Sequence, residues 1–196
     1  REEGRRDRLF REARAQARVE HDHVCKIHEV GVEDGALYIA MQLVDGEPLD
    51  RLRASLTVEQ NVQILRQVAL ALHEAHRLGL VHRDVKPSNI LVERGEDGAL
   101  RPYLTDFGIA REAGAEGATV TGALAGTPAF MAPEQARGEV RARDRRTDVY
   151  CLGATAFDVL AGQPPFHGPK PWALIARILA EDAPPLRRVA PAISAD

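Results

Sequence analysis

Two long stretches of the chain place hydrophobic residues at helical spacing. From Val58 to Ala75 they recur every three or four residues, and Gly79 follows as a stop signal. Thr57 and Gln60 have the spacing of a capping box at the start of this stretch. From Thr147 to Ala161, apolar residues lie nearly all round the expected helix. The pattern therefore predicts one long amphipathic helix and a second long helix that is buried.

Shorter elements are expected in the rest of the chain. The runs 25–32 and 36–44 are rich in β-branched and aromatic residues, and the Glu-Asp-Gly tripeptide between them predicts a hairpin of antiparallel strands. Residues 1–20 carry apolar side chains at helical spacing, which predicts an amphipathic helix. We expect short strands and loops at 80–105, a mobile loop at 111–126 and a short helix at 172–180.

The composition excludes several classes of protein. Of the 196 residues, 44% are hydrophobic and 28% are charged, which is typical of a globular domain and not of a disordered or fibrous chain. The net charge of −3 gives no overall attraction for nucleic acid or for an anionic membrane. The most apolar stretch, 149–162, contains Asp158 and is shorter than the roughly 20 residues that span a bilayer. We expect no nucleic-acid partner and no membrane segment in this chain.

The two cysteines favour a reducing compartment. Cys25 and Cys151 lie far apart and lack the spacing of a disulfide framework or a zinc knuckle. His21 and His23 imitate ligand spacing with Cys25, but no fourth donor stands nearby, so we expect no zinc there. A cytoplasmic location follows as an expectation, and the full-length protein could still be membrane-anchored outside this chain.

Four motifs follow one another along the chain. They are V-H-R-D-V-K-P-S-N-I-L at 81–91, D-F-G-I-A-R at 106–111, G-T-P-A-F-M-A-P-E at 126–134 and T-D-V-Y-C-L-G at 147–153. Chance does not produce these motifs in this order. On them the chain resembles the eukaryotic-type protein Ser/Thr kinases, most of all the bacterial (Hanks-type) members, over nearly its whole length.

The resemblance implies an α+β, protein kinase-like bilobal fold. The chain would supply mainly the helical C-lobe, together with helix C and the following strands of the N-lobe. We expect residues 1–44 to form the remnant of the N-lobe and the hinge, and residues 45–196 to form a C-lobe that is incomplete at its C-terminus.

The chemistry of phosphoryl transfer suits the residues of these motifs. The reaction needs an acceptor hydroxyl held in line and positive charge beside the phosphate oxygens. Asp84 is expected to accept the hydroxyl proton, and Lys86 places an ammonium beside the phosphate. Asn89 and Asp106 offer the hard oxygen ligands that suit Mg²⁺. By resemblance, Lys86 favours Ser/Thr acceptors, and Thr127 bonds near Asp84 and Lys86 as a supporting catalytic residue.

The resemblance assigns the nucleotide site mainly to the earlier part of the chain. Met41 would stand at the back of the adenine pocket and Leu91 beneath the base. Backbone groups of Gln42 and Val44 would pair with the adenine edge. Glu12 falls where the family's helix glutamate pairs with a phosphate-binding lysine. The residues expected to contact ATP are Glu12, Met41, Gln42, Val44, Lys86 and Leu91.

The sequence departs from the family pattern before Glu12. No Gly-rich loop and no lysine precede that residue, and the only lysines are Lys26, Lys86 and Lys170. The arginine expected to pair with Glu134 would lie beyond the C-terminus. We therefore expect the chain to be a kinase fragment, with negligible activity alone. Two other functions stay open: a catalytically inactive pseudokinase scaffold, and a small-molecule phosphotransferase, against which Lys86 and the A-P-E motif argue.

Further expectations concern the protein partners, regulation by phosphorylation and the roles of several single residues. Protein substrates with Ser/Thr acceptors are the implied partners, and self-association would allow autophosphorylation at Thr119 or Thr121. Arg83 would meet the resulting phosphate. A role in structure alone is expected for His82, and zinc is not expected at His73 and His76. Asp148 is expected to cap its helix and, by resemblance, to brace the catalytic loop.

Overall fold

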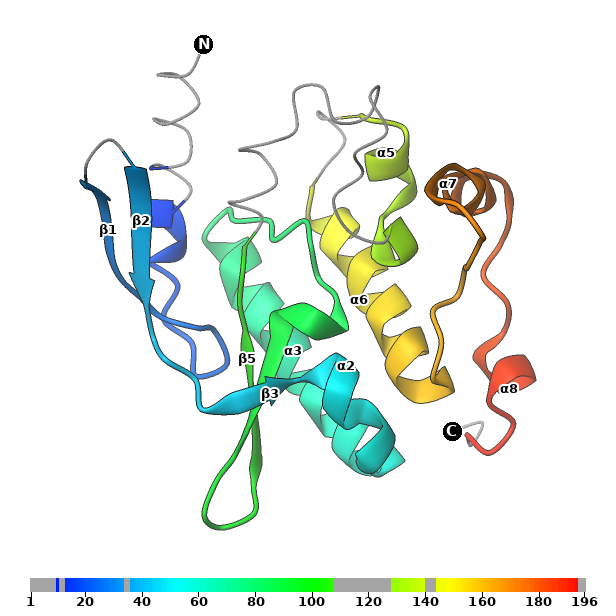
Figure 1. Cartoon of the computed structure of the whole chain (residues 1–196), viewed down its shortest axis with the longest axis horizontal. Helices are drawn as coiled ribbons and strands as arrows, with labels where there is room; N and C mark the ends of the chain where they lie inside the picture. The colour runs from blue at the N-terminus through cyan, green and yellow to red at the C-terminus, as the bar shows by residue number, and fades with distance from the viewer. Residues whose placement is uncertain (1–9, 11–12, 34–35, 108–127, 140–143, 194–196) are drawn as a thin grey trace.

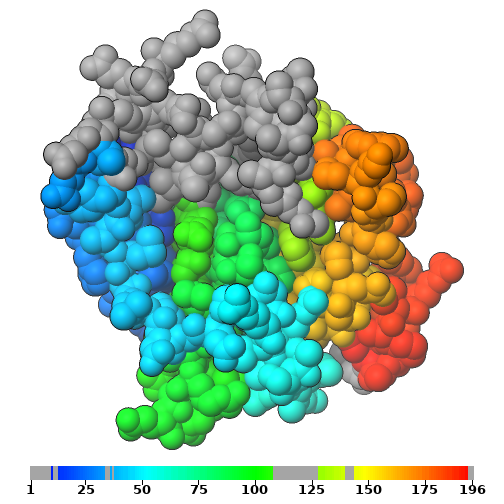
Figure 2. Space-filling model, in the orientation of Figure 1, coloured from blue at the N-terminus to red at the C-terminus, as the bar shows by residue number. Residues whose placement is uncertain are grey.

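The fold combines helices with short antiparallel strands. The computed structural model describes residues 10, 13–33, 36–107, 128–139 and 144–193. Its elements, in chain order, are β1 (Ile27–Glu33), β2 (Ala36–Met41), β3 (Gly46–Pro48), α2 (Leu49–Leu52), η1 (Arg53–Ser55), α3 (Val58–Arg77), η2 (Pro87–Asn89), β4 (Ile90–Arg94), β5 (Leu100–Leu104), η3 (Pro128–Phe130), α5 (Pro133–Ala136), α6 (Arg145–Ala161), α7 (Pro171–Ala180) and α8 (Leu186–Val189). The hairpin of β1 and β2 lies at one side of the molecule, and α7 and α8 lie at the other (Figures 1 and 2).

The two predicted long helices form the centre of the structure. Helices α3 and α6 pack against each other, and α3 also lies against β5 (Figure 1). At the start of α3, the Thr57 hydroxyl accepts from Gln60 N and the Gln60 side chain accepts from Thr57 N, which confirms the capping box. Helix α6 ends at Gly162, whose φ of 76° is the left-handed conformation that glycine adopts at low cost.

The strands form two separate sheets. β1 and β2 pair antiparallel, as predicted. β3, β4 and β5 form a second antiparallel sheet in that order. Gly46 in β3 approaches β4 so closely that a Cβ atom there would lie 2.7 Å from the Val92 carbonyl oxygen. An isolated parallel bridge from Val24 to Leu104 ties the chain before β1 to the second sheet.

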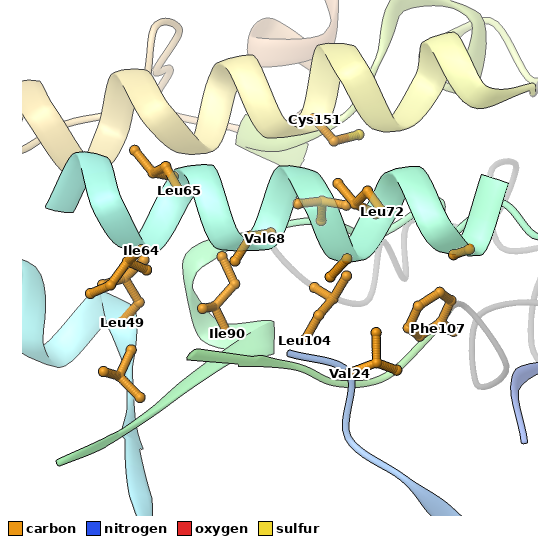
Figure 3. Close-up of a cluster of buried hydrophobic side chains, with 14 of the residues drawn as sticks. Val24, Leu49, Ile64, Leu65, Val68, Leu72, Ile90, Leu104, Phe107 and Cys151 are labelled. Carbon is orange, nitrogen blue, oxygen red and sulfur yellow. The ribbon is translucent and has the colours of Figure 1, made fainter. Parts of the chain in front are cut away.

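One hydrophobic core joins the second sheet to the long helices. Leu49, Ile64, Val68, Ile90 and Leu104 are each at most 1% exposed and pack together (Figure 3). Full burial of such a side chain stabilises a fold by roughly 1.5–3 kcal/mol. Val85 of the loop 82–89 and Leu104 at the end of β5 belong to this core, so both segments are anchored in it.

Several sequence predictions need correction. Helix α6 is not buried on all sides, because Val149 is 65% exposed. Asp144, not Asp148, caps α6 by accepting a hydrogen bond from Arg146 N. The short elements β3, α2, α5 and α8 have no counterpart in the predicted pattern, since three or four residues are too few for a period to show.

No helix among the described residues is both long and apolar enough to cross a bilayer.

We expect Thr57→Ala to lower the free energy of unfolding by about 1 kcal/mol, because the first turn of α3 loses its side-chain acceptor. Thr57→Ser keeps the hydroxyl and is the matched control. Urea unfolding followed by circular dichroism measures both. Equal stability of the alanine and serine variants would contradict a role for the cap.

Candidate active site

The loop between α3 and β4 is held by its backbone. The N–H groups of His82 and Arg83 donate to the Asp148 carboxylate, at 2.8 Å to Oδ2 and 2.6 Å to Oδ1. Gln135 Nε2 donates to the Arg83 carbonyl at 2.7 Å. Arg83 has a φ of 66°, a left-handed conformation that is unfavourable for a residue with a side chain. The surrounding hydrogen bonds therefore fix a strained backbone just before Asp84.

His82 joins this loop to the end of β5. The ring is 0% exposed, its Nδ1 accepts from Asp84 N at 3.2 Å, and its Nε2 lies 2.9 Å from the Thr105 carbonyl. Because Nδ1 is an acceptor, the ring proton sits on Nε2 and is donated to Thr105. Burial lowers the pKa of His82, although Asp148 and other nearby carboxylates oppose that shift. The ring is therefore neutral at neutral pH, in the structural role expected of it.

Asp84 has a cation and an amide beside its carboxylate. Lys86 Nζ lies 2.8 Å from Asp84 Oδ2, and both side chains are partly exposed. Asn89 Nδ2 donates to the Asp84 carbonyl at 2.8 Å and to Asp84 Oδ2 at 3.2 Å. These bonds fix the Asn89 amide plane. Among the described residues, none donates to Asn89 Oδ1.

The residue before Asp106 is bonded to the backbone of Asn89. Thr105 N and Thr105 Oγ1 both donate to the Asn89 carbonyl, at 3.0 and 3.2 Å. Asp106 itself is exposed and has a φ of 56°. The nearby carboxylates of Asp84 and Asp106 both act to raise the pKa of His82, against the larger lowering by burial. The structure thus brings the loop carrying Asp84 and Asn89 together with the turn that carries Asp106.

A cavity of about 280 Å³ opens beside Asp84. Its walls combine charged side chains of the loop with apolar ones from 130–131, and Asp50 from α2 adds a further carboxylate. The lining residues are Asp50, Arg83, Asp84, Val85, Lys86, Ser88, Phe130, Met131, Gln135 and Cys151. An extended chain presenting a hydroxyl group could therefore reach Asp84 from this side.

The residues predicted to bind adenine lie on and near the connection between the two sheets. Met41 ends β2 and is 44% exposed, and Leu91 in β4 is partly buried opposite Pro48. Gln42 N donates to the Lys26 carbonyl at 2.8 Å, so this N–H is already bound. The Gln42 carbonyl accepts only a weak bond from the Cys25 thiol at 3.4 Å. Of the two backbone groups of Gln42, the carbonyl is thus the one that no backbone N–H among the described residues occupies.

Four predicted residues lie outside the described part of the chain: Glu12, Thr119, Thr121 and Thr127. Among the described residues, no group of three or more His, Cys, Asp or Glu side chains is arranged to hold a metal ion.

The protein kinase domain family matches residues 1–187 of the chain. The chain belongs to the protein kinase family. It is 43% identical over 163 residues to the Ser/Thr-protein kinase PknJ of Mycobacterium tuberculosis, covering 82% of this chain and 27% of PknJ. It is 40% identical over 182 residues to PknD of the same species, covering 91% of this chain and 26% of PknD. The chain therefore spans only about a quarter of the length of these two curated relatives.

Solved kinase structures share the fold. A crystal structure of the M. tuberculosis PknI kinase domain superposes with a TM-score of 0.71 at 32% identity, over 96% of this chain and 65% of that one. Rad53 in complex with AMP-PNP superposes with a TM-score of 0.70 at 27% identity, over 88% of this chain and 43% of that one. The expected α+β protein kinase fold is confirmed.

Sequence reasoning missed three positions in the kinase site. Gln135 accepts from Ala132 N at 3.0 Å while it donates to Arg83, and so joins α5 to the loop. Thr105 bonds both His82 and Asn89. The Thr147 hydroxyl donates to the Glu134 carboxylate at 2.5 Å, so Glu134 has a partner on α6. These residues form hydrogen bonds between segments that are distant in the sequence, and no local sequence pattern predicts such bonds.

The stability of this kinase chain should depend on the neutral state of His82. Its pKa lies below the ordinary 6.5 in the folded protein because of burial, so below about pH 6.5 the unfolded chain takes up a proton that the folded protein does not. His82 should then cost at most about 1.4 kcal/mol of stability per pH unit as the pH falls through this range. Urea unfolding between about pH 7.5 and 5.5 measures the effect. His82→Gln should show a flatter profile than the wild type, and parallel profiles would contradict this account.

Proposed function

We propose that the protein carrying this chain transfers the γ-phosphoryl group of ATP to Ser/Thr hydroxyls of proteins. The observation that supports this most is that Lys86 Nζ and Asn89 Nδ2 both contact Asp84 Oδ2. The loop that carries these residues is bonded through Asn89 to Thr105, the residue before Asp106. Phosphoryl transfer needs a proton acceptor, a cation and metal ligands at one point, and these four residues supply them.

Asp84 and Lys86 have distinct parts in the proposed reaction. The acceptor hydroxyl enters from the cavity and donates its proton to the Asp84 carboxylate. A bond forms from the hydroxyl oxygen to the γ-phosphorus as the bond to the bridging oxygen breaks, and ADP leaves. Lys86 stands beside the transferring group and balances its charge. Thr127 is proposed to support the two catalytic residues.

Asn89 and Asp106 would hold Mg²⁺. The fixed amide of Asn89 presents Oδ1, and Asp106 is an exposed carboxylate, so the pair offers the oxygen donors that Mg²⁺ takes alongside water and phosphate. When bound, the ion would neutralise the phosphate oxygens.

The ATP contacts are proposed for Glu12, Met41, Gln42, Val44, Lys86 and Leu91. At Gln42 the contact would go through the carbonyl, since the N–H is bound to Lys26. The division into an N-lobe part with hinge (1–44) and a C-lobe part (45–196) fits the position of the connection between the two sheets. Autophosphorylation at Thr119 or Thr121 after self-association, and a cytoplasmic kinase region, belong to the same proposal.

The direct test is transfer of radiolabelled phosphate from ATP to myelin basic protein by the full-length protein. Asp84→Asn removes the proton acceptor and should lower kcat by roughly 10²–10⁴-fold. Asp106→Asn should raise the Mg²⁺ concentration that is required, because one carboxylate ligand is lost. Asp182→Asn, an exposed position, is the matched control and should match the wild type.

Full transfer by Asp84→Asn, or unchanged Mg²⁺ dependence in Asp106→Asn, would refute these assignments. An inactive wild type that still binds a partner protein would favour the scaffold function instead.

A further inference from the structure

A second cavity lies apart from the one beside Asp84. It has a volume of about 440 Å³ and opens where the segment before β1, the residue after β2 and strand β5 meet. No residue of its lining also lines the cavity beside Asp84. A cavity of this size is typical of a site for a small molecule. The lining residues are Asp22, His23, Lys26, Gln42, Arg101 and Tyr103.

Backbone hydrogen bonds join the segments that form this cavity. Leu104 N donates to the His23 carbonyl at 2.8 Å, and Gln42 N donates to the Lys26 carbonyl at 2.8 Å. Val24 forms a β-bridge with Leu104, and both residues are at most 1% exposed (Figure 3). The walls of the cavity are therefore already in place in the absence of a ligand.

Strand β5 turns two side chains away from the core and into the lining. Arg101 and Tyr103 lie on one face of the strand, whereas Pro102 between them is buried on the other face. The Tyr103 hydroxyl donates to the Glu93 carboxylate at 3.1 Å, which orients the ring. Arg101 lies 3.8 Å from Asp97, and both of these side chains are more than half exposed. Such a surface pair is weak, so Arg101 can exchange it for a ligand.

Positive charge exceeds negative charge in the lining. Lys26 and Arg101 face one carboxylate, that of Asp22. Among the described residues, no carboxylate lies within ion-pair distance of the exposed Lys26 ammonium. His23 Nδ1 lies 3.0 Å from the Pro102 carbonyl, which can only accept, so Nδ1 carries the ring proton. The other ring nitrogen of His23 can take up a proton beside an anion.

We propose that this cavity binds a phosphate monoester. The planar guanidinium of Arg101 suits two phosphate oxygens, and Lys26 adds a point charge from the other segment of the wall. The cavity is larger than a phosphate group, so it has room for the molecule that carries the phosphate. This binding site goes beyond the proposed kinase reaction and does not depend on it.

Isothermal titration calorimetry of the full-length protein with O-phospho-L-serine tests the site. Arg101→Gln and Lys26→Gln should each raise Kd roughly tenfold, because each removes a charged partner of the phosphate. Asp22→Asn should lower Kd about threefold, because it removes a negative charge from the lining. Arg66→Gln and Lys170→Gln alter exposed cations outside the lining, so these matched controls should bind as the wild type does.

Two probes separate the sources of the phosphate. The same titration is made with a short peptide that contains phosphoserine. Tighter binding of the peptide assigns the cavity to a phosphorylated protein, and tighter binding of the free amino acid assigns it to a small phosphorylated metabolite. Both results support the site if Arg101→Gln weakens them.

Three results would overturn the proposal: no binding of either probe to the wild type, an unchanged Kd in Arg101→Gln and Lys26→Gln, or an equal loss in Arg66→Gln. Weaker binding by Asp22→Asn would also contradict it. The expected gain in that variant cannot come from a misfolded protein. Because the titration needs no phosphoryl transfer, its outcome is independent of whether the proposed function holds.

Discussion

One buried carboxylate, that of Asp148, is the interaction on which the rest of the site depends. It accepts from two consecutive backbone N–H groups of the loop 82–89 and lies against His76. Helix α6 carries Asp148 and helix α3 carries His76, so the packing of these two helices sets the geometry of the loop. The stability of the core and the position of Asp84 are therefore linked. A change that separates the helices would displace the reactive carboxylate.

From this point a chain of hydrogen bonds extends to the expected metal ligands. The His82 ring bonds the Thr105 carbonyl, the Thr105 hydroxyl donates to the Asn89 carbonyl, and the Asn89 side-chain amide donates to the Asp84 carbonyl. The ring of His82 also lies 4.5 Å from that of Phe107, which follows Asp106. The hydrophobic core and the hydrogen bonds between the loop residues thus restrict the movement of the polar side chains. Electrostatic catalysis requires such fixed groups.

Much of this arrangement was predictable from the sequence, and the reasons differ between elements. The long helices and the hairpin have periods that extend over many residues, so the pattern alone indicates them. Asp84, Asn89 and Asp106 were found because they stand at fixed positions in motifs. The roles of Gln135, Thr105 and Thr147 were not predictable, since each bonds a partner that only folding brings near. The exposure of Val149 was not predicted either, because the apolar composition of α6 does not show which face of the helix packs against other elements.

A crystal structure with Mg²⁺ and AMP-PNP tests the central claim most directly. The account expects one Mg²⁺ with Asn89 Oδ1 and an Asp106 carboxylate oxygen at about 2.0–2.1 Å, and Asp84 turned toward the cavity that admits the acceptor. An ion bound away from these two residues, or Asp84, Asn89 and Asp106 facing separate cavities, would contradict it.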